Sequence, residues 1–138
     1  PLPVRHPILS GIQPWTYRDE MFSRYFLYHD PRRTELLQAM PATTSNGGPD
    51  PVSWVFNRPD GGRSFVWGGS DFHDNMHNVA AYRKYLLNGI AWIAGLEVPA
   101  GGVDAPAPPA DDPPIPVSQP GRRGAGAGPT GGLGTPTP

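Results

Sequence analysis

The chain contains no cysteine, and this absence removes several kinds of chemistry at once. Disulfides, thiolate metal sites and thiol nucleophiles are all excluded. Basic residues are scattered and the formal net charge is −1, so no electrostatic footprint for a nucleic-acid partner exists. The longest apolar candidate, Tyr85 to Leu96, is shorter than the roughly 18–20 residues of a membrane span, and no membrane partner is expected. Phosphate-binding glycine loops and nucleophile elbows are also missing.

Proline and glycine are abundant, and most of the excess lies at one end of the chain. Of 138 residues, 20 are Pro and 18 are Gly. Residues 104–138 are dominated by Pro, Gly, Ala and Thr, and they offer little apolar surface to offset the entropy of ordering. This composition predicts a foldable part over 1–103 and a disordered tail or linker over 104–138. The tail is expected to connect to a larger parent polypeptide or another domain, and the sequence does not indicate a cellular compartment.

Local patterns predict three strands and two helices. The second and third strands are β-branched and aromatic, and the Pro-Asp-Gly-Gly run of residues 59–62 predicts a tight hairpin turn between them. Thr16 is a plausible N-cap for the first helix. The predicted strands are 34–40, 51–57 and 63–67, and the predicted helices are 16–26 and 78–94.

The second helix is the longest amphipathic element. Asn78 is its expected N-cap and Gly95 its expected C-terminal stop. Apolar residues recur at steps of 3, 4, 4 and 3, which is one face of a helix. The predicted buried face consists of Val79, Tyr82, Leu86, Ile90 and Ile93.

So few strands predict a thin sheet that is covered on one face only. A helix as apolar as that over 78–94 needs a broader sheet to cover it. We therefore expect the chain to be the C-terminal part of a larger α/β domain. The alternative is a complete small α+β domain.

Groups capable of chemistry gather in the polar loop after the third strand. In open α/β sheets, ligands bind at the C-terminal ends of strands, and His73 would act there as a general acid/base or hydrogen-bond donor, with Asp71 and Asn75 beside it. The alternative is that Asp71 and Asn75 are turn or capping residues and that His73 is merely packed. His73 and His77 are four residues apart, but this metal signal is weak and no metal is predicted.

Further candidates lie early in the chain. Asp19 and Glu20 are adjacent, so on a helix only one of them, Glu20 in preference, would point into a site; the alternative is helix capping. His6 either lines a pocket or lies on the surface. Aromatic side chains stack on sugars or fill the core, and the candidates are Trp15, Tyr17, Trp54 and Trp67.

Several short motifs follow one another in a specific order within residues 1–103. They are His6-Pro7-Ile8, Asp19-Glu20, Pro51-Val52-Ser53-Trp54, Gly62-Arg63-Ser64-Phe65, Phe72-His73-Asp74-Asn75 and Leu87-Asn88-Gly89-Ile90. Together they resemble the trehalose-utilisation, or ThuA-like, family. The resemblance implies a flavodoxin-like, class I glutamine-amidotransferase-like three-layer α/β fold, of which this chain would lack the N-terminal βα units.

The same resemblance implies a role in the utilisation of carbohydrate, with trehalose or another small-molecule sugar or glycoside as the partner and no cofactor. Cys-dependent amidotransferase chemistry does not carry over, because the chain has no Cys. An active enzyme would be hydrolase-like or sugar-modifying. The alternatives are a non-catalytic carbohydrate-binding or structural module, and a fragment without independent activity. The resemblance implies a pocket in which His73 and Asn75 follow the third strand and Asp19 or Glu20 approaches from the earlier helix. We predict His73 and Glu20 as catalytic residues, and Asp19, Asn75, Asp71 and His6 as substrate-binding residues.

Overall fold

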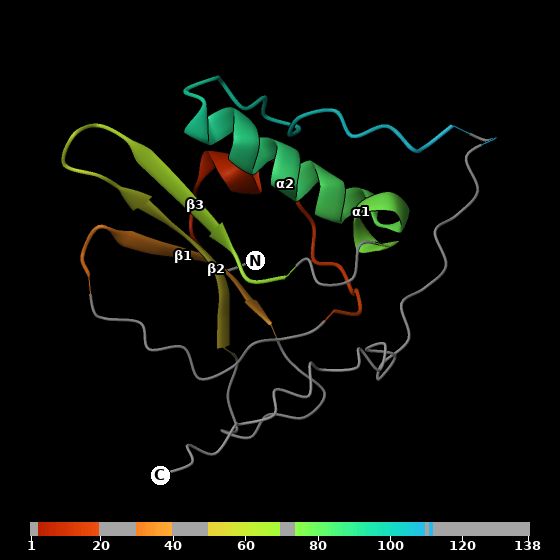
Figure 1. Ribbon diagram of the computed structural model, residues 1–138, viewed down its shortest axis with the longest axis horizontal. Helices are drawn as coiled ribbons and strands as arrows, with labels where there is room; N and C mark the ends of the chain where they lie inside the picture. The colour runs from red at the N-terminus through yellow and green to blue at the C-terminus, as the bar shows by residue number, and fades with distance from the viewer. Residues whose placement is uncertain (1–2, 20–29, 40–49, 70–73, 110, 112–138) are drawn as a thin grey trace, which may run out of the picture.

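The computed structural model describes residues 3–19, 30–39, 50–69, 74–109 and 111. Figure 1 shows α2 packed on one side of three strands, with the short turn η1 beside it. The predicted mixed α/β class is therefore confirmed. In chain order the elements are a 3₁₀ turn η1 (Pro7–Leu9), strands β1 (Arg33–Ala39), β2 (Asp50–Asn57) and β3 (Arg63–Trp67), and helices α1 (Asp74–Asn78) and α2 (Ala80–Ile93).

The three described strands form an antiparallel sheet in the order β1-β2-β3, and all three agree with the predicted ranges to within one or two residues. The predicted hairpin joins β2 to β3, with Asn57 opposite Arg63. Its turn is closed by a 2.8 Å hydrogen bond from the Arg58 amide to the Gly62 carbonyl. Gly61 has φ of +80°, a conformation that favours glycine.

The central strand β2 is buried on both of its faces. Val52 and Trp54 are 2% and 8% exposed, and Ser53 and Val55 are 0% and 1% exposed. Successive side chains of a strand point to opposite faces, so both faces of β2 are covered. The prediction of a sheet covered on one face only is therefore wrong for this strand.

The long helix begins later than predicted. Residues 74–78 form the separate short helix α1. Val79 interrupts the helical backbone between α1 and α2 with an extended conformation at φ −112° and ψ 101°. Asn78 is therefore the last residue of α1 and not the N-cap of α2, whose N-cap Val79 makes no side-chain capping bond. The predicted C-terminal stop is confirmed, because Gly95 follows the helix with φ of +77°.

The face that α2 buries also differs from the predicted one. Ile90 and Ile93, expected in the core, are 56% and 45% exposed. Phe65 of β3 packs closely on Gly89, where an added Cβ would lie 2.3 Å from the phenyl ring. Tyr82 is the member of the predicted face that is fully buried. The observed buried residues of α2 are Tyr82, Tyr85, Asn88, Gly89 and Trp92.

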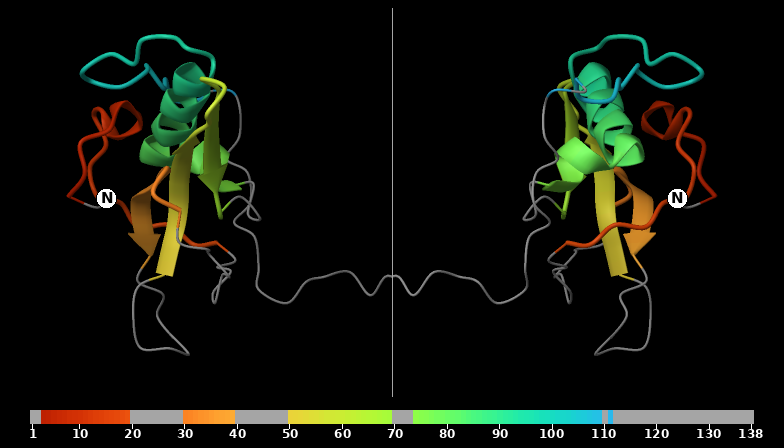
Figure 2. Two further views of the ribbon diagram at one scale, coloured as in Figure 1. Left: turned by 90° about the vertical axis from the view of Figure 1, so that its left-hand side faces the viewer. Right: turned by 90° about the vertical axis from the view of Figure 1, so that its right-hand side faces the viewer.

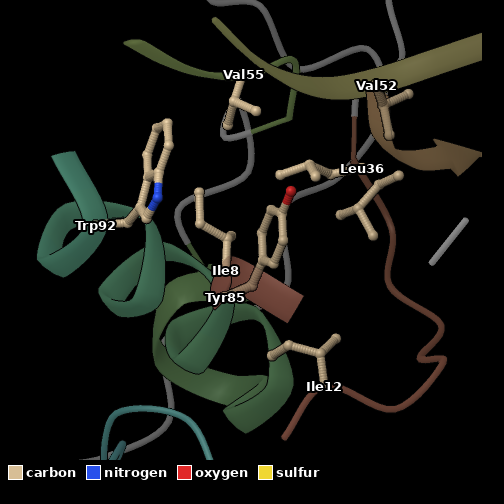
Figure 3. Packing of buried hydrophobic residues seen from close by; sticks show 8 residues of the cluster. Ile8, Ile12, Leu36, Val52, Val55, Tyr85 and Trp92 are labelled. Atoms are coloured by element: carbon tan, nitrogen blue, oxygen red, sulfur yellow. The ribbon is translucent and has the colours of Figure 1, made fainter. Parts of the chain in front are cut away.

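Side chains from η1, the sheet and α2 meet in one core (Figure 3). Ile8 and Ile12 are 0% and 8% exposed, so the N-terminal segment packs inward. Leu36 and Leu37 are both buried because the register of β1 shifts between Glu35 and Gln38. Burying each such side chain stabilises the fold by roughly 1.5–3 kcal/mol, before the opposing entropy.

The N-terminal segment and the segment that follows α2 in the sequence both pack against this helix. In Figure 2, α2 lies between the N-terminal segment and β3. The segment that follows α2 runs back along the helix, where Gly101 accepts a 2.8 Å hydrogen bond from Lys84 Nζ and Pro106 accepts one of 3.2 Å from Arg83 Nη2. The first residues of the predicted tail, 104–109, therefore begin in contact with the helix. Most of the tail lies outside the described residues.

The predicted helix over 16–26 is not found where it can be examined. Residues 16–19 carry no helical structure, so the predicted N-cap role of Thr16 is wrong. Residues 20–26 lie outside the described part of the chain.

Candidate functional site

Two of the predicted site residues, Asp19 and Asn75, lie together although 56 positions separate them. The Asn75 amide nitrogen donates to the carbonyl oxygen of Arg18 at 2.7 Å and to Asp19 Oδ2 at 3.4 Å. Asn75 is 4% exposed and is held in the first turn of α1, which follows the end of β3. These contacts place the Asp19 carboxylate beside the start of α1; the substrate-binding roles expected for Asp19 and Asn75 stay predictions.

A second carboxylate, that of Asp74, directly precedes Asn75 in the sequence. Asp74 is the first residue of α1 and is 6% exposed. A carboxylate in the first turn of a helix is stabilised by the unpaired amides and the helix dipole. This position agrees with the alternative interpretation of the loop, in which acidic residues serve turns and helix starts.

A group of aromatic rings lies next to Asp19 in the chain. Trp15, Tyr17 and Trp67 lie within 6.0–6.4 Å of one another between ring centroids, with interplanar angles of 24–30°. All three are half-buried. Tyr82 of α2 closes the group, because its ring meets Tyr17 and Trp67 edge-on at 5.5 and 5.2 Å. We call Trp15, Tyr17, Trp67 and Tyr82 the aromatic group.

Hydrogen bonding within the aromatic group is uneven. Trp67 Nε1 donates to the Tyr82 hydroxyl at 2.9 Å. Trp15 Nε1 is buried and has no hydrogen-bond partner in the described part of the chain. A buried N–H without an acceptor is costly to the fold.

The sequence patterns distinguished only some of the core aromatic residues from those of the aromatic group. Trp54, also considered for sugar stacking, is 8% exposed and belongs to the interior of β2. Tyr82 was expected only as a core residue of the long helix. Its position three residues before Tyr85 on the buried face places it in the aromatic group, and no sequence signal distinguishes that role from ordinary packing.

His6 lies apart from the Asp19–Asn75 pair. Its ring meets Trp92 edge-on at 4.9 Å, at the C-terminal end of α2. Asn75 lies before the N-terminal end of α2, and a helix of 14 residues is about 21 Å long. The structure therefore does not bring His6 together with Asp19 and Asn75. Instead, His6 Nδ1 accepts a 3.3 Å hydrogen bond from the Ile8 amide and caps η1.

Three predicted site residues lie outside the described part of the chain. They are Glu20, Asp71 and His73. Their expected roles, acid/base chemistry for Glu20 and His73 and substrate binding for Asp71, remain predictions.

The described residues hold no group of three or more His, Cys, Asp or Glu side chains that could bind a metal ion. Among the same residues, every helix is too short or too polar to cross a lipid bilayer.

The described site therefore combines a carboxylate, an amide and several aromatic rings. Carboxylate and amide groups exchange hydrogen bonds with hydroxyl groups, and aromatic faces offer apolar stacking surfaces. We also compared the chain with known proteins. No family model, no curated protein and no solved structure matches it.

Proposed function

We propose that this chain is a ThuA-like domain that binds a small-molecule sugar or glycoside, such as trehalose, in carbohydrate utilisation. The observation that carries the proposal is the contact between Asn75 and Asp19 beside the aromatic group. A few fixed polar groups next to aromatic surface is the usual composition of a small-molecule site. The order of motifs in the sequence supports the family.

The chemistry of these residues suits a sugar. The Asp19 carboxylate accepts hydrogen bonds from hydroxyl groups, and Asn75 both donates and accepts them. Trp15 and Tyr17 are half-buried, and in this proposal their exposed parts contact the C–H surface of a pyranose. In this proposal Asp71 contributes further hydrogen bonds, and His6 has no direct contact with the sugar.

The catalytic part of the proposal assigns acid/base chemistry to His73 and Glu20. A histidine titrates near neutral pH and suits either proton donation or acceptance. The reaction would be hydrolase-like or sugar-modifying, without Cys and without a cofactor.

A non-catalytic carbohydrate-binding module is the second candidate. It is favoured by the buried Asn75, whose amide is used to hold the main chain at Arg18 as well as the Asp19 carboxylate. Such a residue fixes the shape of a binding surface without taking part in proton transfer.

The fold proposed with this function is flavodoxin-like. The described strands are all antiparallel, whereas flavodoxin-like folds are built on a parallel sheet. In this proposal the described hairpin lies beside a parallel sheet whose strands are not among the described residues.

The binding proposal is tested by titrating the chain with trehalose and a panel of glycosides, with calorimetry and the Asn75 side-chain NMR signals as readouts. Asp19→Asn keeps the shape and removes the charge, and Trp15→Ala removes a ring face. We expect each to weaken binding at least about tenfold, the cost of one charged or stacking contact. Asp104→Asn, at an exposed position, is the matched control. Failure of every sugar to bind the wild-type chain would contradict the proposal.

The variant His73→Ala distinguishes a catalytic function from binding alone. If the chain is an enzyme, this variant should lose turnover while it still binds the sugar. If the wild-type chain binds a sugar that it never turns over, the non-catalytic module is the correct function.

A further inference from the structure

The turn η1 of the N-terminal segment is capped by an imidazole that must be uncharged. His6 Nδ1 accepts the Ile8 amide at 3.3 Å and so caps η1. An imidazole nitrogen accepts a hydrogen bond only when it carries no proton, so the neutral ring holds its proton on Nε2. Protonation of Nδ1 removes the cap.

The groups that face His6 oppose a positive charge there. Arg63 of β3 places its guanidinium 5.0 Å from the centre of the Trp92 ring and donates to the Trp92 carbonyl at 2.8 Å. From α2, the uncharged ring of Trp92 meets His6 edge-on, and η1 presents the buried Ile8. Burial, and secondly the charge of Arg63, lower the pKa of His6 below its usual value.

The same segment leads from His6 to the candidate site. After the cap come the buried Ile8, whose carbonyl accepts from Asn88 at 2.9 Å, and then Ile12. The segment continues to Trp15 of the aromatic group and ends at Asp19, beside Asn75. It therefore runs past α2 from the C-terminal end, at Trp92, toward α1.

We propose that His6 is a pH-sensitive latch for residues 6–19. Protonation of the ring removes the bond to the Ile8 amide and sets two positive charges, on His6 and Arg63, against each other. The segment then opens more often from α2. Since Trp15 and Asp19 are carried on this segment, acid weakens the candidate sugar site, a consequence that rests on the proposed function.

The latch is tested by amide hydrogen exchange on the full chain between pH 7.5 and 5.5. The reporters are the amides of Leu9 and Ser10, which bond to the carbonyls of His6 and Pro7 at 2.9 Å. We expect their protection, corrected for the intrinsic rate, to fall about 2- to 10-fold on acidification, the range of one hydrogen bond. The amide of Val55, in the buried part of β2, is the internal reference.

His6→Asn is the decisive variant, because asparagine caps helices well and does not titrate. It keeps the other three of the four histidines of the chain. We expect protection at Leu9 and Ser10 to be independent of pH in this variant. Equal pH dependence in wild type and His6→Asn would overturn the latch.

The consequence for the site has a separate readout. Sugar affinity should fall more steeply between pH 7.5 and 5.5 in wild type than in His6→Asn, which keeps His73. Absence of sugar binding at both pH values would contradict the proposed function, while the exchange experiment would still decide the latch. Sugar affinity that is equal at both pH values, although Leu9 loses protection, would overturn the link between latch and site.

Discussion

The side-chain amide of Asn88 donates to the carbonyl oxygen of Ile8 at 2.9 Å, across 80 positions of sequence. The same amide donates to the Ser10 carbonyl at 3.0 Å, and Asn88 Oδ1 accepts from the Val103 amide at 2.7 Å. Asn88 is completely buried. One side chain of α2 thus fastens the segment before the sheet and the segment after the helix.

Replacement of Asn88 by Ala should lower the free energy of unfolding by about 2–4 kcal/mol, because three main-chain groups lose their partner inside the protein. Urea unfolding followed by circular dichroism measures the change. Asn78→Ala, at an exposed position, should change stability by less than about 0.5 kcal/mol. A loss below about 1 kcal/mol for Asn88→Ala would show that water replaces the missing bonds.

Gly89→Ala should destabilise the fold even though alanine favours helices. An added Cβ would lie 2.3 Å from the Phe65 ring, and overpacking of this kind costs about 1–3 kcal/mol. Gly101→Ala is the matched control, because its Cβ would meet no atom within 4 Å. Phe65→Leu in the Gly89→Ala background should recover part of the loss. Thermal unfolding of the four proteins gives the comparison, and a stabilised Gly89→Ala would contradict the observed packing.

Tyr85 and Ser53 should show energetic coupling. The Tyr85 hydroxyl donates to Ser53 Oγ at 2.7 Å, and Ser53 Oγ donates to the Val66 carbonyl at 2.6 Å. Burial raises the pKa of Tyr85, so the hydroxyl remains a donor at neutral pH. Tyr85→Phe should cost about 0.5–1.5 kcal/mol, and Ser53→Ala more, since it strands a buried hydroxyl. The double variant should cost less than the sum of the two; strict additivity in urea unfolding would argue against the pair.

Stability should fall as the pH drops below about 6.5, the ordinary histidine value. Burial first, and Arg63 second, lower the pKa of folded His6, so in this window the unfolded chain binds a proton that the folded chain does not. The contribution is fully present above the unfolded pKa and is lost as the pH falls toward the folded one. Urea unfolding between pH 7.5 and 5 should show a steeper fall in wild type than in His6→Asn. Parallel curves would exclude a contribution from His6.

The strands were predictable because their signals are local. Residues 51–57 and 63–67 are β-branched and aromatic, and Pro59 and Gly61 mark the turn between them, so the hairpin follows from the chain itself. The stop at Gly95 is equally local, since its positive φ suits glycine. The contact of Asp19 with Asn75 joins residues 56 positions apart, and the site roles expected for them stay predictions.

The buried face of α2 could not be read from apolar spacing. Periodicity assigns Ile90 to the core, but the structure leaves Ile90 exposed and buries Asn88. The buried Asn88 finds hydrogen-bond partners in Ile8 and Ser10, far away in the sequence, and in Val103. Gly89, next to Ile90, is where Phe65 packs closely. Likewise, the break at Val79 and the position of His6 at Trp92 depend on tertiary contacts that no window of sequence contains.

The bond between Asn88 and Val103 has a consequence for biosynthesis. While a ribosome is still adding residues before 103, the carboxamide oxygen of Asn88 lacks its amide partner, and the return segment that supplies Gly101 and Gly102 is incomplete. The nascent chain can form its hairpin and begin α2, but closure around Asn88 must wait until Val103 has been translated. Because newly added residues still lie inside the ribosome, this closure also waits for the synthesis of part of the proline-rich remainder.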